Sequence, residues 1–129
     1  MTVLVDTNVL VFDTFEDAEL HEDARDKLDS QPQWHIPSIV FHEFMWFMRS
    51  QKVNLKFTKQ KIEEYLMHEK TVFSPTQVDD ILFAAKEVRN RSEYNDFVIL
   101  SHSKRLGVTL FTYDVSLKKE ATKRGVKTL

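Results

Sequence analysis

The sequence predicts an α/β fold with a mainly parallel central sheet. Three observations support it. Short apolar runs alternate with helical patterns along the chain, which is typical of a parallel sheet. Two of the runs end at an aspartate, Asp6 and Asp114. The 129 residues contain only two glycines and three prolines and no linker, so we expect residues 1–129 to form a single domain.

The predicted elements follow one another without long gaps. They are, in order, strand 2–5, helix 16–28, strand 34–36, helix 38–50, helix 58–69, strand 72–73, helix 76–88, helix 94–106, strand 108–111, helix 116–124 and a short edge strand 126–129.

In the first half, residues 2–5 form a β-branched run that stops at a polar turn, residues 6–8. Residues 16–28 carry an apolar residue at every fourth position among acids, which predicts an amphipathic helix with an acidic outer face. After strand 34–36, Ser38 is placed to cap an unusually apolar helix. Thr58 is placed to cap the helix that follows.

In the second half, strand 72–73 leads to Pro75, which opens the next helix, with Asp79 at its third position. Gly107 ends helix 94–106, and strand 108–111 leads to a turn at Asp114. Apolar spacing defines helix 116–124. We expect Asp80, which directly follows Asp79, to be a helix-start charge without a special role.

Composition excludes several classes of protein. The chain has no cysteine, which excludes disulfides and thiolate metal sites and favours the cytoplasm. The longest apolar run, residues 44–48, is far too short to cross a membrane. Net charge is −2, but residues 1–30 carry nine acids and two bases, whereas residues 101–129 carry seven bases and two acids. The basic end is suited to contact phosphate.

Four acids are candidate site residues. Asp6 and Asp114 follow strands, and parallel strands end at the edge of the sheet where ligands bind. Glu43 projects from an apolar helix face, which indicates a buried ion pair, a protonated carboxyl group or the rim of a pocket. Asp96 lies in a first helical turn, where an acid is favourable in any case. Were the four to share one crevice, their repulsion would call for a cation, and oxygen ligands select Mg²⁺ or Mn²⁺.

The segments that carry these acids resemble the PIN-domain ribonucleases, in order and along essentially the whole chain. They are Val3-Leu4-Val5-Asp6-Thr7-Asn8-Val9-Leu10, His42-Glu43-Phe44, Asn95-Asp96-Phe97 and Leu110-Phe111-Thr112-Tyr113-Asp114. The small single-domain form most resembles the toxins of VapBC toxin–antitoxin pairs. The resemblance implies a three-layer α/β/α sandwich and RNA cleavage with one or two Mg²⁺ or Mn²⁺ ions.

The resemblance also implies residue roles. Asp6, Glu43, Asp96 and Asp114 match the catalytic metal ligands of the family. Polar neighbours match the groups that orient them; these are Thr7, Asn8 and Thr112, for which ordinary turn hydrogen bonding is an equal alternative. One departure is the polar segment of residues 101–103, Ser-His-Ser, where the family usually has small apolar residues; we expect Ser101 and His102 on a helix surface.

Partners follow from the same resemblance. We expect an RNA substrate, a small cognate antitoxin, a homodimer and no membrane. Candidate phosphate contacts are Arg49, Lys52, Lys104 and Lys118, although charge runs usually face solvent. The apolar helix with Glu43 offers more apolar surface than one helix side can bury, so it is the candidate antitoxin contact.

Other functions stay open at this point. The alternatives are a PIN-fold module that binds RNA or protein without cutting, and a PIN nuclease of RNA maturation or DNA repair. A helical zinc protease is excluded, because Trp46 stands four residues after His42, where the second histidine ligand would be needed.

Overall fold

The structure is a computed structural model that describes residues 2–129, and four parallel strands form its central sheet. The strands are β1 (Thr2–Val5), β2 (Gln33–Pro37), β3 (Thr71–Ser74) and β4 (Thr109–Phe111). Their order across the sheet is β3-β2-β1-β4, and every neighbouring pair is parallel. The α/β class with a parallel sheet is confirmed.

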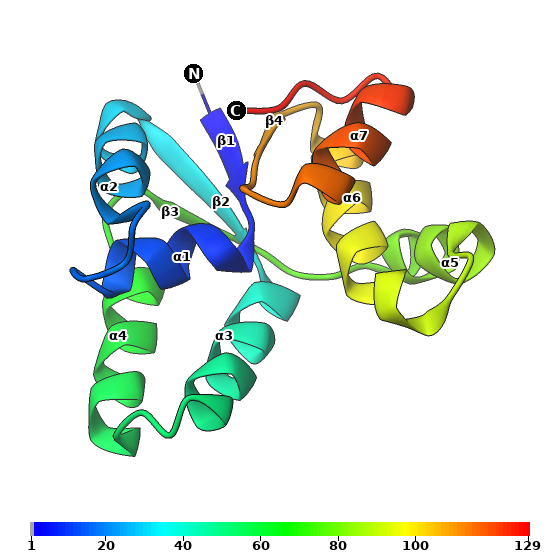
Figure 1. Cartoon of the computed structure of the whole chain (residues 1–129). Coiled ribbons are helices and arrows are strands. Elements are labelled where there is room, and N and C mark those ends of the chain that lie inside the picture. The colour runs from blue at the N-terminus through cyan, green and yellow to red at the C-terminus, as the bar shows by residue number, and fades with distance from the viewer. Residues whose placement is uncertain (1) are drawn as a thin grey trace.

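Helices cover both faces of this sheet. They are α1 (Thr7–Thr14), α2 (His21–Ser30), α3 (Ser38–Ser50), α4 (Leu55–Met67), α5 (Val78–Glu87), α6 (Tyr94–Leu106) and α7 (Val115–Lys123), with a short 3₁₀ helix at Arg91–Glu93. Figure 1 shows α1 to α4 on one side of the sheet and α5 to α7 on the other, which gives three layers. None of the helices in residues 2–129 has both the length and the apolar character that a membrane span requires.

The strand order creates a crevice between β1 and β4. The chain leaves β1 toward β2 and β3, then crosses to the opposite face and returns to the other side of β1. Such a reversal opens a crevice at the carboxyl ends of β1 and β4, where ligands bind in open α/β sheets. Asp6 and Thr112 follow those two strand ends.

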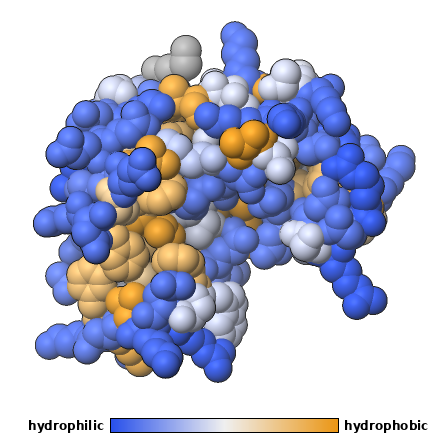
Figure 2. Space-filling model, viewed as in Figure 1, coloured by the Kyte–Doolittle hydropathy of each residue, from blue (hydrophilic) through white to orange (hydrophobic). Residues whose placement is uncertain are grey.

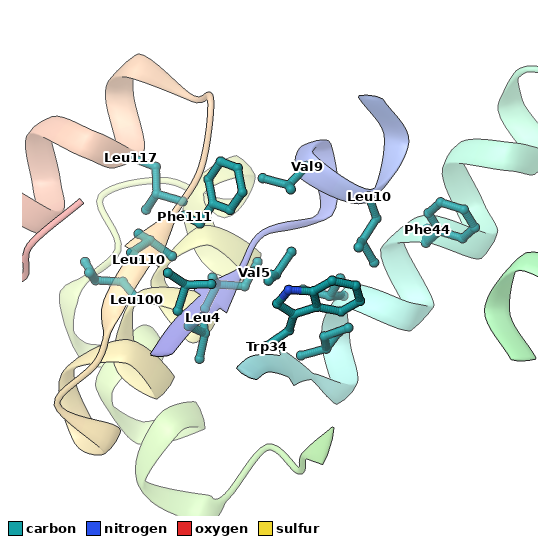
Figure 3. Packing of buried hydrophobic residues seen from close by; sticks show 14 of the residues in the cluster. Leu4, Val5, Val9, Leu10, Trp34, Phe44, Leu100, Leu110, Phe111 and Leu117 are labelled. Atoms are coloured by element: carbon teal, nitrogen blue, oxygen red, sulfur yellow. The ribbon is translucent and has the colours of Figure 1, made fainter. Parts of the chain in front are cut away.

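The core lies on both faces of β1. Figure 3 shows Leu100 and Leu117 on one side of the strand and Leu10 and Phe44 on the other, and all four are buried. Apolar burial on both faces explains why β1 is a continuous apolar run rather than an alternating one. It also fixes the strand end that carries Asp6.

Several predicted boundaries were wrong. Residues 6–8 begin helix α1 rather than a turn, and Asp6 is the N-cap of that helix. The helix predicted from residue 16 starts at His21. Asn54, not Thr58, caps α4, because its side chain accepts from the amide of Phe57 at 3.2 Å. The predicted final strand is reduced to one bridge between Leu110 and Thr128.

The start of α5 also differs from the prediction. Gln77 is the N-cap, so Asp80 rather than Asp79 is the third residue of the helix, and Asp80 Oδ2 accepts from the Gln77 amide at 2.9 Å. Asp80 is fully buried. It pairs with Arg105 through two hydrogen bonds of 3.1 and 2.9 Å. The expectation that Asp80 is an ordinary helix-start charge was therefore wrong.

The polar segment of α6 lies inside the protein, contrary to the prediction of a helix surface. Ser101 is 7% exposed and His102 is fully buried. The Ser101 hydroxyl donates to Asp80 at 2.8 Å, and the His102 ring bonds Ser74 at 2.8 Å and Thr76 at 3.1 Å. These buried polar groups find their partners on α5, at the last residue of β3 and on the segment that follows it.

Candidate metal centre

Asp6 lies at the end of β1 with both carboxylate oxygens hydrogen bonded. The amide of Thr7 donates to Oδ1 at 2.7 Å, and the hydroxyl of Thr112 donates to Oδ2 at 2.6 Å. The side chain is 4% exposed. Burial and, to a smaller extent, the nearby carboxylates of Glu43 and Asp114 raise the pKa of Asp6 to about 6, against the effect of the two hydrogen bonds. Asp6 is thus a fixed carboxylate in negative surroundings.

Glu43 projects from α3 toward the same crevice. Its Oε1 accepts from the Thr7 hydroxyl at 2.5 Å, and its Oε2 accepts from the Asn95 amide nitrogen at 3.2 Å. Thr7 directly follows Asp6, and Asn95 directly precedes Asp96. Among residues 2–129, Glu43 forms no ion pair, so the alternative of a buried salt bridge is excluded there.

Asp96 has the most strongly perturbed carboxylate of the crevice. It lies in the first turn of α6 and is partly buried. Burial and, to a smaller extent, the charges of Asp6, Asp114 and Glu43 raise the pKa of Asp96 to about 7. Repulsion of this kind requires carboxylates that lie near one another.

Asp114 and Thr112 follow β4. Asp114 caps α7, since its Oδ1 accepts from the Leu117 amide at 3.1 Å. The buried Thr112 hydroxyl donates to Asp6, and it accepts from the Asp114 amide at 3.0 Å and from the Asn8 side chain at 3.3 Å. Asn8 Oδ1 in turn accepts from the Tyr113 amide at 3.2 Å. Thr112 and Asn8 therefore join the two strand ends.

All four predicted acids line one pocket of about 400 Å³. Its other lining residues are Thr7, Asn8, Val11, Phe12 and Phe47. Neither lysine nor arginine is among the lining residues that the structure describes. Four carboxylates without a cation of the chain form a strongly negative pocket.

The donor set fits a hard divalent cation. Carboxylate oxygens are the ligands that Mg²⁺ and Mn²⁺ prefer, and a bound cation would relieve the repulsion that raises the pKa values of Asp6 and Asp96. In the described part of the chain, no three acidic or histidine side chains form a ready-made metal cage. Ion binding would therefore have to draw the carboxylates closer together.

The predicted phosphate contacts are spread over the molecule. Lys118 lies one helical turn beyond Asp114 on α7. Arg49 is exposed near the end of α3, with its guanidinium 5.5 Å from the Trp46 ring centre, and Lys52 is exposed in the turn that follows. Lys104 is at the opposite end of α6 from Asp96 and lines another pocket. None of the four lines the carboxylate pocket.

Sequence reasoning missed two features of the site. Asn95 holds Glu43, although its only sequence signal is its position beside Asp96. The apolar wall of the pocket comes from Val11, Phe12 and Phe47. Val11 and Phe12 belong to α1, the helix that the sequence did not predict.

Comparisons with known proteins agree with this geometry. The family model of the PIN domain matches residues 3–122. Comparison with curated proteins gives no match.

Solved structures show the same fold at low sequence identity. The Mycobacterium tuberculosis VapC20, a sarcin–ricin loop cleaving toxin, matches with a TM-score of 0.79 and 12% identity over 92% of this chain and 94% of that chain. VapBC2 from Rickettsia felis, in a structure with a DNA fragment from its promoter, matches with a TM-score of 0.69 and 16% identity over 100% of this chain and 98% of that chain. FitAcB from Neisseria gonorrhoeae matches with a TM-score of 0.65 and 18% identity over 98% and 96%. On the strength of the family match over residues 3–122, and with a fold and a carboxylate pocket in agreement, this chain belongs to the PIN domain family.

Proposed function

We propose that the chain is a metal-dependent endoribonuclease and the toxin of a type II toxin–antitoxin pair. The observation that carries the proposal is the convergence of Asp6, Glu43, Asp96 and Asp114 on one pocket at the carboxyl ends of β1 and β4. A single domain of residues 1–129 that acts in the cytoplasm is part of the proposal. The fold similarity to VapC20, itself a toxin that cleaves RNA of the sarcin–ricin loop, supports the substrate class.

The four carboxylates would hold one or two Mg²⁺ or Mn²⁺ ions. Such ions activate water, orient it and neutralise charge on a phosphodiester. The chain's own residues supply the geometry. Thr112 and the Thr7 amide fix the two oxygens of Asp6, and the Thr7 hydroxyl and Asn95 fix those of Glu43.

We assign receipt of the water's proton to one of two carboxylates of the pocket, Asp96 or Glu43. Asp6 and Asp114 lie at rigid strand and helix junctions, which preserves their positions while the proton moves.

An antitoxin is the proposed protein partner, and the toxin itself is proposed to be a homodimer. The structural neighbours include the two-component assembly VapBC2 of R. felis. On this chain, α3 and α4 expose large apolar side chains, among them Trp46 at 60%, Leu55 at 57% and Met67 at 75%. Figure 2 shows apolar residues gathered on this face, over α1 and the α3–α4 pair. A patch of this kind is typical of a protein contact.

The test of the nuclease is cleavage of a labelled mixed-sequence RNA with Mg²⁺, with Mn²⁺ and with chelator. Wild type should cut with either metal and not with chelator. Asp6→Asn and Asp96→Asn should lose the activity while keeping the fold by circular dichroism. Asp79→Asn is the matched control, because Asp79 is an exposed acid outside the pocket. RNA binding without cleavage by wild type would favour a PIN-fold binding module instead.

The partner proposal has its own test. Trp46→Ser and Met67→Ser should reduce co-elution with a co-expressed candidate antitoxin, without loss of RNA cleavage by the free protein. Light scattering on the free protein tests the homodimer. Unchanged co-elution of both variants would exclude the α3–α4 surface as the contact.

A further inference from the structure

The carboxylate pocket has a second, apolar half. On α1, Asn8, Val11 and Phe12 are spaced i, i+3 and i+4, so they share one helix face. On α3, Glu43 and Phe47 are spaced i and i+4 and also share a face. All five line the same pocket. Its wall therefore changes from carboxylates at the sheet edge to apolar groups about one helical turn, or 5.4 Å, farther out.

The apolar half is held in place by neighbouring side chains. The ring of Phe12 packs edge-on against Tyr113, with centroids 5.3 Å apart and planes at 87°. The Tyr113 hydroxyl is fixed in turn by Asp23 at 2.6 Å. Phe12 and Phe47 are both partly buried against the core. Two aromatic side chains thus form a fixed surface beside the acids, which we call the aromatic shelf (Phe12 and Phe47).

Little in this pocket can read the polar edge of a ligand. The Thr7 hydroxyl donates to Glu43. Asn8 bonds Tyr113 through its oxygen and Thr112 through its amide nitrogen, which leaves one further N–H of Asn8. The remaining lining groups are the carboxylates and the apolar wall. The outer half is therefore suited to a flat apolar surface, recognised by stacking rather than by hydrogen bonds.

We propose that the aromatic shelf binds one unpaired nucleobase of an RNA substrate, next to the phosphodiester held at the carboxylates. This inference rests on the proposed nuclease function and adds a subsite for one base beside the cleaved bond. A base inside a duplex is stacked and paired and cannot reach a side pocket, whereas a splayed base of a loop or single strand stacks readily on aromatic rings. Because stacking does not distinguish base edges, the shelf contributes affinity but little base preference.

The test uses a short single-stranded RNA with one fluorescent 2-aminopurine, titrated in the Asp96→Asn background to prevent cleavage. With the shelf intact, stacking should quench the fluorophore. Phe47→Ala should weaken binding about tenfold and remove the quenching, as expected for the loss of one stacked base. Phe47→Trp should restore both, because it keeps an aromatic surface. Phe41→Ala is the matched control, since Phe41 lies on α3, partly buried, but outside the pocket.

An abasic RNA separates stacking from a structural effect. If Phe47 stacks on a base, Phe47→Ala should not weaken binding of RNA that lacks a base at that position. An equal loss on intact and abasic RNA would overturn the proposal, and so would unchanged binding of intact RNA by Phe47→Ala and Phe12→Ala. Loss of the protein partner with unchanged RNA binding would assign the shelf to that partner instead and would also overturn it.

The proposed nuclease function and the proposed base-binding shelf can be refuted separately. If wild type neither binds nor cuts RNA with any metal, the nuclease and the shelf are both wrong. If wild type cuts RNA and the phenylalanine variants cut single strands and duplexes as wild type does, only the shelf is wrong. The expected result is a drop of about tenfold in kcat/KM on single strands for Phe47→Ala.

Discussion

The hydroxyl of Thr112 donates a hydrogen bond of 2.6 Å to Oδ2 of Asp6, although the two residues are 106 positions apart. They meet because β1 and β4 are parallel neighbours, with Val5 opposite Phe111. The same hydroxyl accepts from Asn8 and from the Asp114 amide. The Thr112 side chain thus connects Asp6 and Asp114, two of the four acids.

Removal of this hydroxyl tests its role in positioning. Thr112→Val keeps the shape but removes the donor that favours the ionised form of Asp6, so Mn²⁺ affinity should fall about 10- to 100-fold. Thr112→Ser keeps the hydroxyl and should stay close to wild type. Titration calorimetry with Mn²⁺ measures both. Equal affinities for valine and wild type would show that Thr112 does not support the site.

The raised pKa values predict how stability depends on pH without metal. Asp6 and Asp96 have pKa values of about 6 and about 7 in the folded protein, against 3.8 for an ordinary aspartate. The folded state therefore binds protons more tightly than the unfolded state, and stability falls as pH rises from about 4 to about 7. In chelator at pH 8, Asp96→Asn should melt about 2–8 °C above wild type.

Thermal unfolding at pH 5 and pH 8 checks this sign. At pH 5 the difference between Asp96→Asn and wild type should shrink, because Asp96 is then mostly protonated. Added Mn²⁺ should stabilise wild type at pH 8 more than the variant. A wild type that melts above Asp96→Asn at pH 8 in chelator would contradict the repulsion among the acids.

Asn95 provides a test at the outer rim of the site. It is exposed and donates to Glu43 at 3.2 Å. Asn95→Ala should lower RNA cleavage about fivefold, since one hydrogen bond to a carboxylate is lost, and should change the free energy of unfolding by less than about 0.5 kcal/mol. The control is Asn90→Ala, because Asn90 is also an exposed asparagine but lies before α6. Equal activity of the two variants would remove Asn95 from the site.

The pair of the buried Asp80 and the exposed Arg105 predicts a stability effect without a catalytic one. Burial alone would raise the pKa of Asp80, but the Arg105 guanidinium, the Gln77 amide and the Ser101 hydroxyl together lower it. Its contribution to stability is thus present above the unfolded pKa and is lost as pH falls through the lower folded pKa. Asp80→Ala should reduce the free energy of unfolding by about 1.5–3 kcal/mol in urea titrations, because the hydrogen bonds to a charged group are lost. Asp79→Ala should change it little, and a similar loss in both would refute the pairing.

The strands and the positions of the acids could be predicted because their signals are local. The apolar run of residues 2–5 and the aspartate that follows it are visible without neighbours. The carboxylate of Glu43 on an apolar helix face is also visible from the local sequence alone. The family resemblance ordered these acids, and the structure places them in one pocket.

Helix α1 could not be predicted from its own residues. Thr7, Val9 and Val11 are β-branched, which disfavours a helix, and the segment is apolar without a clear polar face. Burial of Val9 and Leu10 against the core outweighs that local preference. The apolar wall of the pocket, which comes partly from this helix, was hidden for the same reason.

The buried polar cluster depends on contacts between distant segments. His102 appears as a polar residue in a helix, and only the approach of Ser74, Thr76 and Asp80 makes its burial favourable. Lys104 shows the opposite case. Its proximity in sequence to Asp96 suggested a shared site, but Asp96 lies in the first turn and Lys104 in the last turn of the 13-residue helix α6.

The central claim is that Asp6, Glu43, Asp96 and Asp114 form one divalent-cation centre. Titration of the metal-free protein with Mn²⁺ tests it most directly, with wild type beside Asp6→Asn, Glu43→Gln, Asp96→Asn, Asp114→Asn and the control Asp79→Asn. The account predicts saturable binding of one or two ions by wild type and the control, weakened in each of the four site variants. Absence of Mn²⁺ binding by wild type, or binding that the four substitutions leave unchanged, would contradict it.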